Sequence, residues 1–191
     1  MKKNLILLFV MMFTIILASC ERKKQPVVEP VVDTLMVENF ISMDKEFVFV
    51  NYSEDYRWYE TNVTLKNFLD ETDSLGIDEV GNVFQFVKDD PQVVITAHND
   101  SIDKVELFNS FWIEDFDMSE DSIVVTFKEA FDKVMAVNLP KPHSKHVILR
   151  KPMGPLDCNP QWVFGNVESQ IWIDAVTGNV AESNPAFQVG E

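Results

Sequence analysis

The N-terminal segment constrains this chain more than any other feature, because it decides which residues can belong to a folded domain. Lys2 and Lys3 are followed by a charge-free apolar run from Leu5 to Leu17. As a helix this run would be roughly 20 Å long, too short to cross a bilayer core of about 30 Å. Basic residues, a short apolar run and then small residues are the order of a secretory signal peptide. We therefore expect residues 1–19 to be removed and the folded part to lie outside the cytoplasm.

A second and more specific pattern closes this apolar run. Leu17-Ala18-Ser19-Cys20 resembles the bacterial lipobox, in which the cysteine is acylated and becomes the mature N-terminus after cleavage. The resemblance implies that Cys20 is a lipidation site whose acyl chains, palmitate among them, anchor the protein to a membrane. The next residues, Glu21-Arg22-Lys23-Lys24, are basic on balance and lack the acidic run that resembles a surface-export signal. We expect a lipid-anchored, periplasm-facing protein of the cell envelope; the alternative is a short buried helix with a chance cysteine.

Residues 20–34 are expected to form an extended tether between the membrane and the folded part. Pro26 and Pro30 lie in this segment, and proline favours the polyproline II conformation and removes hydrogen-bond donors. The pattern becomes globular after the tether. We expect two folded units, at residues 35–118 and 119–191.

The charge balance restricts the partners. The chain has 16 Lys and Arg residues against 31 Asp and Glu residues, a net charge of −15, and loss of Lys2 and Lys3 would leave 14 against 31, or −17. Such a charge argues against binding to nucleic acid or anionic lipid. It favours a basic envelope protein or peptide as partner, although a solvated acidic exterior is the simpler explanation. With Cys20 acylated, Cys158 is the one remaining thiol, so no internal disulfide is expected.

Thr126 marks the start of the clearest helix. Thr126-Phe127-Lys128-Glu129 has the form of a capping box, in which the threonine and the glutamate accept the free amides of the first turn. The apolar residues after Thr126 recur at helical spacing and form one stripe: Phe127, Ala130, Phe131, Val134 and Met135. Asn138 and Pro140 end the helix. By contrast, Glu46 to Val50 is rich in aromatic and β-branched residues, which predicts a strand.

An internal similarity predicts the architecture. Val63–Asp70 aligns with Val125–Asp132 at an offset of 62 positions, with Val, Thr, Lys and Asp identical. Three strand-like runs follow each copy: residues 82–87, 92–98 and 102–111 after the first, and residues 145–150, 161–164 and 170–174 after the second. Two copies of a helix followed by an antiparallel meander predict an α+β fold of two similar units.

The end of the chain contains a hairpin motif. In Trp172–Val180, Asp174 can accept turn amides and Gly178 can take a positive φ. This stretch resembles the DA-x-TG-x-V hairpin that closes PepSY-type domains, and the resemblance extends over residues 122–182, although the insertion at residues 151–159 departs from the compact form. It implies tandem PepSY-like units in an envelope lipoprotein of the Bacteroidota type. Domains of this family bind or restrain other envelope proteins, peptidases among them, and are not known as catalysts.

The histidines and Cys158 do not form a recognised site. His143 and His146 precede Asp157 and Cys158, and zinc accepts all of these ligand types. The spacing matches no recognised zinc pattern, and positions three apart on a strand face opposite sides. A nucleophile made of Cys158 and one of the histidines lacks the nearby cation or helix start that would activate the thiol.

Other motifs for chemistry are also missing from the sequence. The acidic residues from Asp115 to Asp121 alternate as in a calcium loop, but Glu120 and Thr126 stand where an EF-hand needs Gly and Glu. There is no Gly-rich phosphate loop, no Gly-x-Ser-x-Gly and no His-Glu-x-x-His. We expect no enzymatic activity, no metal and no cofactor.

Aromatic residues are the candidates for a binding surface. Trp112, Trp162 and Trp172 are the partner-binding candidates, and we expect at least one of them to be exposed, because Trp dominates interface hot spots. On alternating strands Trp162 and Phe164 share one face, and Trp172 and Asp174 share another. The expected function is a non-enzymatic protein-binding or inhibitory module. The alternatives are a structural or small-ligand-binding envelope component and, third, a hydrolase.

Overall fold

A computed structural model describes residues 36–183, apart from residues 89–90, 102, 113–114 and 155–157. The predicted signal peptide (1–19) and tether (20–34), with the lipidation residue Cys20, lie outside the described residues. No helix in the described part is both long and apolar enough to span a bilayer.

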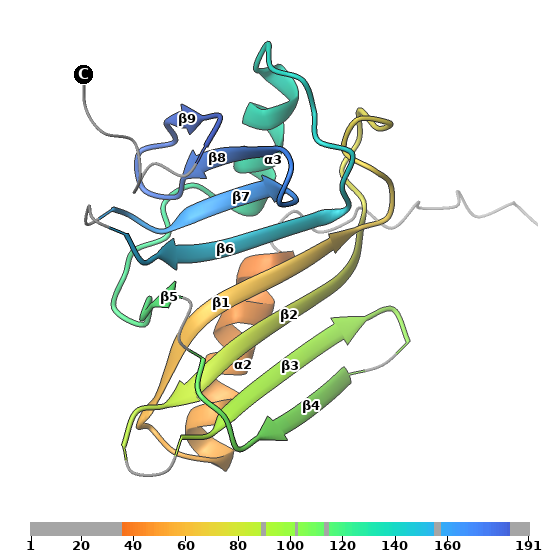
Figure 1. The fold of residues 1–191 in the computed structure, drawn as a ribbon. Coiled ribbons are helices and arrows are strands. Elements are labelled where there is room, and N and C mark those ends of the chain that lie inside the picture. Colours follow the sequence, from red (N-terminus) through yellow and green to blue (C-terminus); the bar gives the residue numbers. More distant parts are fainter. Residues whose placement is uncertain (1–35, 89–90, 102, 113–114, 155–157, 184–191) are drawn as a thin grey trace, which may run out of the picture. The chain divides into compact units, whose positions relative to one another are not determined.

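The described part has the predicted α+β class, with two helices and nine antiparallel strands. The helices are α2 (Met36–Asn51) and α3 (Phe127–Ala136). The strands are β1 (Tyr56–Leu65), β2 (Ile77–Phe86), β3 (Val93–Asn99), β4 (Asp103–Phe108), β5 (Asp115–Phe116), β6 (His146–Pro152), β7 (Gln161–Gly165), β8 (Gln170–Asp174) and β9 (Val180–Ala181). They form one sheet in the order β4-β3-β2-β1-β6-β7-β8-β9, with β5 paired to β6 (Figure 1).

The order of elements along the chain repeats. Helix α2 precedes the meander β1 to β4, and α3 precedes the meander β6 to β9. The first strands of the two meanders, β1 and β6, pair in the middle, so the chain runs outward to β4 at one edge and β9 at the other. Both helices lie behind the same side of the sheet, which we call the helix face, and the opposite side is the open face (Figure 1).

The core lies between the helices and the helix face. The predicted stripe of α3 is confirmed, since Phe127, Ala130, Phe131 and Val134 are buried. Burial of each large apolar side chain contributes about 1.5–3 kcal/mol. The predicted capping box is also present: the Glu129 amide donates to Thr126 Oγ1 (3.3 Å), and the Thr126 amide donates to Glu129 Oε2 (2.9 Å). The helix begins where the sequence predicts it.

The predicted hairpin after β8 is confirmed in its local chemistry. Asp174 Oδ1 accepts the amides of Val176 (2.9 Å) and Thr177 (2.7 Å). Burial raises the pKa of Asp174, but hydrogen bonds from Thr177, Asn159 and Val176 outweigh it and leave this pKa below its usual value. Gly178 has a φ of 74°, a conformation that a side chain with a Cβ atom rarely adopts.

The predicted strand at Glu46–Val50 is wrong, because these residues form the last part of α2. Val37, Ile41 and Val48 recur at helical spacing and are buried against the sheet. Local β-propensity was therefore overridden by burial of one helix face. Asp44 lies in the same buried stripe, where a charged residue hides the periodicity.

The predicted helix at Val63–Asp70 is also wrong. Val63 to Leu65 are the end of β1, and Val63 pairs with Val80 on one side and Val147 on the other. The similar sequence at Val125–Asp132 begins α3. These residues form a strand because β1 pairs with a strand on each side. An eight-residue sequence similarity carries no information about such distant pairing partners. The helix that opens the first meander is α2.

The sheet divides at a bulge in β1. The pairing of β1 with β2 shifts between Trp58 and Glu60, and β6 pairs with β1 only from Glu60 to Thr64. Beyond this point β5 pairs with the end of β6, and the Met118 amide donates to the Trp58 carbonyl (2.8 Å). Residues 115–118 therefore fill the space between β1 and β6.

Candidate protein-interaction surface

Two of the three predicted anchor tryptophans are buried. Trp162 lies on the helix face, is 0% exposed and donates its indole N–H to the Val125 carbonyl (2.9 Å). Trp172 lies on the opposite face, is 4% exposed and donates to Gln170 Oε1 (3.0 Å). The predicted opposite orientation of these two side chains is confirmed. Neither can serve as a surface anchor in this structure, because packing within the sheet covers it. Trp112 is half-buried and is the candidate that retains accessible surface.

Trp112 belongs to a segment that crosses the open face. We call residues 109–118 the crossover segment; residues 113–114 within it lie outside the described part. The Trp112 amide donates to the side-chain oxygen of Gln85, which projects from β2 on the open face. Together with the β5–β6 pairing and the Met118 bond to β1, this contact ties the described residues 112, 115, 116 and 118 of the segment to the sheet.

The crossover segment exposes aromatic side chains although several of its described residues are hydrogen-bonded to the sheet. Phe111 is 64% exposed, and Phe116 is also exposed. The indole N–H of Trp112 is buried and has no acceptor among the described residues. Large aromatic side chains that a fixed backbone holds in water are suited to bury their area against a partner, because little conformational entropy is lost on binding.

A buried carboxyl pair lies beneath the crossover segment. Asp115 of β5 accepts Arg150 Nε (2.7 Å), and Glu60 of β1 accepts Asn62 Nδ2 (2.6 Å). Burial raises the pKa of Glu60 to about 7; the charge of Asp115 and a hydrogen bond with it add to the rise, while Asn62 and Arg150 oppose it. One guanidinium faces two carboxyl groups, so the arrangement favours a proton on Glu60.

A second buried network lies on the helix face, between α2 and the sheet. Asp44 of α2 accepts Asn82 Nδ2 (2.7 Å) and the hydroxyl of Thr96, and its other oxygen lies 2.9 Å from His98 Nε2. The second ring nitrogen of His98, Nδ1, lies 2.9 Å from Asp103 of β4. Burial lowers the pKa of His98, but hydrogen bonds and charges from Asp103 and Asp44 outweigh it and raise this pKa.

The residues weighed as zinc ligands and not predicted to bind metal are not gathered into one site among those described. His143 Nδ1 lies 3.0 Å from Asp70, and these two groups with Glu71 fall within 4.8 Å of one another at the surface. His146 and the half-buried Cys158 are not part of this group. Asp157 lies outside the described residues. Exposed acidic groups of this kind are common without a metal.

The acidic stretch from 115 to 121 does not form a calcium loop. Its carboxylates point to different cationic partners: Asp115 to Arg150 (2.7 Å), Asp117 to Arg57 (3.8 Å) and Asp121 to Lys151 (3.2 Å). The stretch therefore ties the crossover segment to β1 and β6. Sequence analysis missed Glu60 and Asp44. The signal was present for Asp44, which interrupts the buried apolar stripe of α2, whereas Glu60 has polar neighbours in β1 and no such signal.

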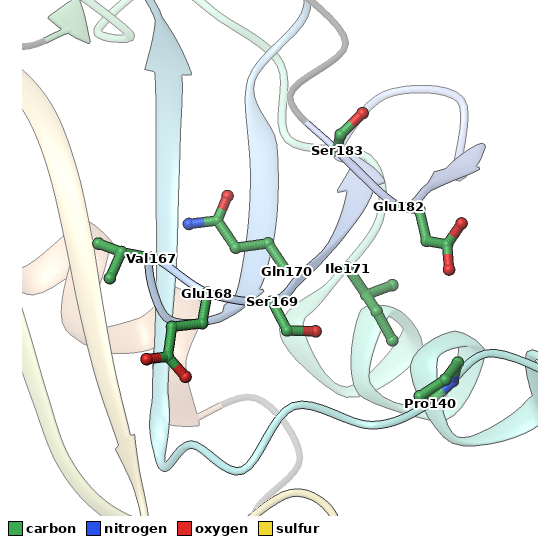
Figure 2. A pocket seen from close by; sticks show the side chains of 8 residues that line it. All are labelled: Pro140, Val167, Glu168, Ser169, Gln170, Ile171, Glu182 and Ser183. Carbon is green, nitrogen blue, oxygen red and sulfur yellow. The ribbon is translucent and has the colours of Figure 1, made fainter.

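Two open pockets lie at the surface of the described part. One, of about 480 Å³, opens between the β7–β8 turn and the end of α3 (Figure 2). Its lining is mainly polar: Pro140, Val167, Glu168, Ser169, Gln170, Ile171, Glu182 and Ser183. Ile171 points toward Pro140, whereas Val167 points away into solvent (Figure 2). A second pocket borders the crossover segment at Phe116 and Asp117. Glu60 does not line either of these two pockets.

Comparisons with family models, with curated proteins and with solved structures give no significant match to this chain. Its function is therefore argued from its own residues.

Proposed function

We propose that this chain is a membrane-anchored, extracytoplasmic lipoprotein that binds another envelope protein or peptide and catalyses no reaction. In this proposal Cys20 carries the acyl chains and residues 20–34 hold the folded part off the membrane. Residues 35–118 and 119–191 are two PepSY-like units joined by the pairing of β1 with β6. The repeated order of a helix and four strands supports this division, as does the hairpin at Asp174 to Gly178.

One observation carries the binding function. Phe111 and Phe116 of the crossover segment are exposed and Trp112 is half-buried, while hydrogen bonds to β1, β2 and β6 hold the described residues 112, 115, 116 and 118 against the sheet. Large aromatic side chains contribute much of the binding energy when a partner buries them, and a preorganised segment loses less entropy on binding. The buried ion pair of Asp115 with Arg150 holds the segment from below. Phe111, Trp112 and Phe116 are the proposed anchors.

The charge of the chain supports a basic partner. A net charge of −15 attracts cationic surfaces over distances of about 8–10 Å at physiological salt. Such attraction raises the association rate, whereas desolvated aromatic anchors slow dissociation. Added salt should therefore slow association more than it speeds dissociation.

Position-specific photocrosslinking in intact cells tests the proposal. A photoreactive residue at position 111 should capture a defined protein. The same residue at Val167, which is 98% exposed on the β7–β8 turn, should not capture that protein. Phe111→Ala should weaken binding of the captured protein about tenfold while the urea midpoint is unchanged, since truncation of a hot-spot residue costs more than about 1 kcal/mol. Equal capture from both positions would remove the support for this surface.

The anchor has a separate test. Cys20→Ala should abolish metabolic labelling with radioactive or clickable acyl chains, because no acceptor thiol remains at the lipobox. Continued labelling of that variant would contradict the lipoprotein assignment without bearing on the interaction surface.

The alternative function, a structural or small-ligand-binding component, has weaker support. A small-ligand site is ordinarily an enclosed and mainly apolar cavity. The pocket in Figure 2 is open and lined mostly by carboxylates, hydroxyls and an amide.

A further inference from the structure

The outer edge of β4 has the properties of a site for an added strand. β4 (Asp103–Phe108) is the first strand of the sheet and pairs with β3, and no strand of the described part pairs with its other side. An edge strand presents a row of backbone N–H and C=O groups that can hydrogen-bond to another chain. The opposite edge, β9, is only two residues long (Val180–Ala181). The long free edge therefore belongs to β4.

β4 has neither a proline nor a bulge to protect this edge. Natural edge strands are usually interrupted by proline, a bulge or an isolated charge. The pairing of β4 with β3 is regular over six residue pairs, and the strand contains no proline. Its one cation, Lys104, forms an exposed ion pair with Glu106 two residues along the same face. The edge is open to backbone pairing.

Apolar side chains accompany the free edge on the helix face. Val105 and Leu107 project to this face, since they stand opposite Thr96 and Val94, and both are exposed. Phe47 of α2 is exposed as well. A strand added next to β4 would cover Val105 and Leu107 with every second side chain. This gives the added strand an apolar face as well as a backbone ladder.

The start of β4 is held in place by the helix-face network. His98 lies between Asp44 of α2 and Asp103, with an oxygen 2.9 Å from each ring nitrogen. Phe40 stacks on the same ring at 4.5 Å. The first residue of β4 is thus linked through His98 to a buried carboxylate, which fixes the edge before any partner arrives. A preorganised edge loses less entropy on binding.

Charge decides the kind of segment that fits. Asp103 at the start of β4 and Asp100 just before it are about 80% exposed. A second copy of this chain would bring an equally acidic edge and a net charge of −15. A cationic segment would instead be attracted. The edge therefore favours a basic partner over self-association.

We propose that β4 is a strand-addition site that takes an extended segment of another protein in which basic and apolar residues alternate. Its backbone pairs with the outer edge of β4, its apolar residues cover Val105 and Leu107, and its cations lie near Asp100 and Asp103. This site does not include Phe111, Trp112 or Phe116, so a result that contradicts one of the two proposals leaves the other unaffected.

Synthetic peptides test the proposal on the full chain in a zwitterionic detergent. The probe is an eight-residue peptide of alternating Lys and Val, labelled and capped at both ends. The controls are a peptide of the same composition with the four lysines and four valines in separate blocks, and the alternating peptide with N-methylated amides along one edge. We expect the alternating peptide to bind at least tenfold more tightly than either control and to protect amides of residues 103–108 from hydrogen exchange.

Two substitutions in β4 test whether the peptide binds at this strand. Leu107→Lys should weaken binding of the alternating peptide about tenfold, and Val105→Lys should act in the same direction; both positions are exposed and tolerate a charge in the fold. Val167→Lys, with the same charge change at a distant turn, should leave binding within twofold of the parent. Equal binding of all three peptides, or no effect of either β4 variant, would overturn the site. So would concentration-dependent dimerisation that Leu107→Lys abolishes, because a second copy would then be the occupant.

Discussion

The two buried polar networks lie on opposite faces of one sheet, and their buried charges are compensated in different ways. On the helix face, one carboxylate, Asp44, accepts hydrogen bonds from Asn82 and Thr96 and faces one imidazole, that of His98. On the open face, two carboxyl groups, Glu60 and Asp115, share one guanidinium. A buried charge is tolerated when it is paired and hydrogen-bonded, so the first network is balanced as an ion pair. The second is balanced only while one carboxyl group holds a proton.

The Asp44 network is therefore structural, whereas the network of Glu60 and Asp115 responds to pH. The donors of Asp44 come from β2 and β3, so the network fastens α2 to the sheet. The Glu60–Asp115 pair fastens the crossover segment to β1 and β6, and its strength depends on the protonation of Glu60. The proposed binding segment therefore rests on the network that changes within the physiological pH range.

The largest expected effect is on the helix face. Asp44→Ala would leave Asn82, Thr96 and His98 without their acceptor in a buried site, and the free energy of unfolding should fall by about 3–5 kcal/mol. Urea unfolding followed by circular dichroism measures it. Asp103→Ala, which removes the exposed carboxylate on the other side of the same ring, should cost much less. Equal costs for the two variants would contradict the distinction between buried and exposed partners.

The next effect is a pH dependence set by Glu60. Its pKa is about 7 in the folded chain against an ordinary value of 4.5, so the folded state binds the proton more tightly than the unfolded state does. The contribution of Glu60 to stability is therefore greatest below pH 4.5 and is lost as the pH rises through 7. With about 1.4 kcal/mol for each pH unit, the loss amounts to about 3 kcal/mol.

Glu60→Gln isolates this contribution, because glutamine resembles the protonated carboxyl group. We expect the variant to match the parent at pH 4.5 and to be more stable by up to about 3 kcal/mol at pH 8. Glu79→Gln, an exposed position on the neighbouring strand β2, is the matched control and should show no such difference. Parallel stability curves for the parent and Glu60→Gln across this range would show that Glu60 is not the group responsible.

The helix cap gives a reference value for a polar contact at the surface. Thr126→Ala removes the side chain that accepts the Glu129 amide, and the free energy of unfolding should fall by about 0.5–2 kcal/mol. Thr126→Ser keeps the hydroxyl and should retain most of the stability. A cost as large as that of Asp44→Ala would mean that burial does not distinguish the two kinds of contact.

The smallest effect is on the titration of His98. Its pKa is raised by Asp103 and Asp44 against the effect of burial, so its contribution to stability is present below its ordinary value of 6.5 and is lost as the pH rises through the raised value. Asp103→Asn should lower the His98 pKa, as NMR titration of the ring protons would show. His146, an exposed residue, serves as the internal control in the same spectra. If the His98 pKa is unchanged in this variant, Asp103 does not contribute to raising it.

Local sequence determined the elements whose signals are short and self-contained. The cap at Thr126, the apolar stripe of α3 and the turn from Asp174 to Gly178 each depend on contacts within a few residues, and all three are as predicted. Strands β2 to β4 and β6 to β8 were also predicted, because turn residues separate them, whereas β1 was not. The α+β class follows from these elements alone.

Tertiary structure decided the rest, since it can reverse a local preference and can hide a side chain that composition marks as a surface anchor. Residues 46–50 favour a strand, but burial of one face against the sheet makes them helical. Val63–Asp70 resembles the start of α3, but pairing with β2 and β6 makes its first part a strand. Trp162 and Trp172 are covered by the packing of the sheet, while Trp112 lies on a segment whose position depends on Glu60, Asp115 and Arg150, three residues far apart in the chain. Such long-range contacts have no local sequence signature, because the free energy that forms them comes from the assembled core.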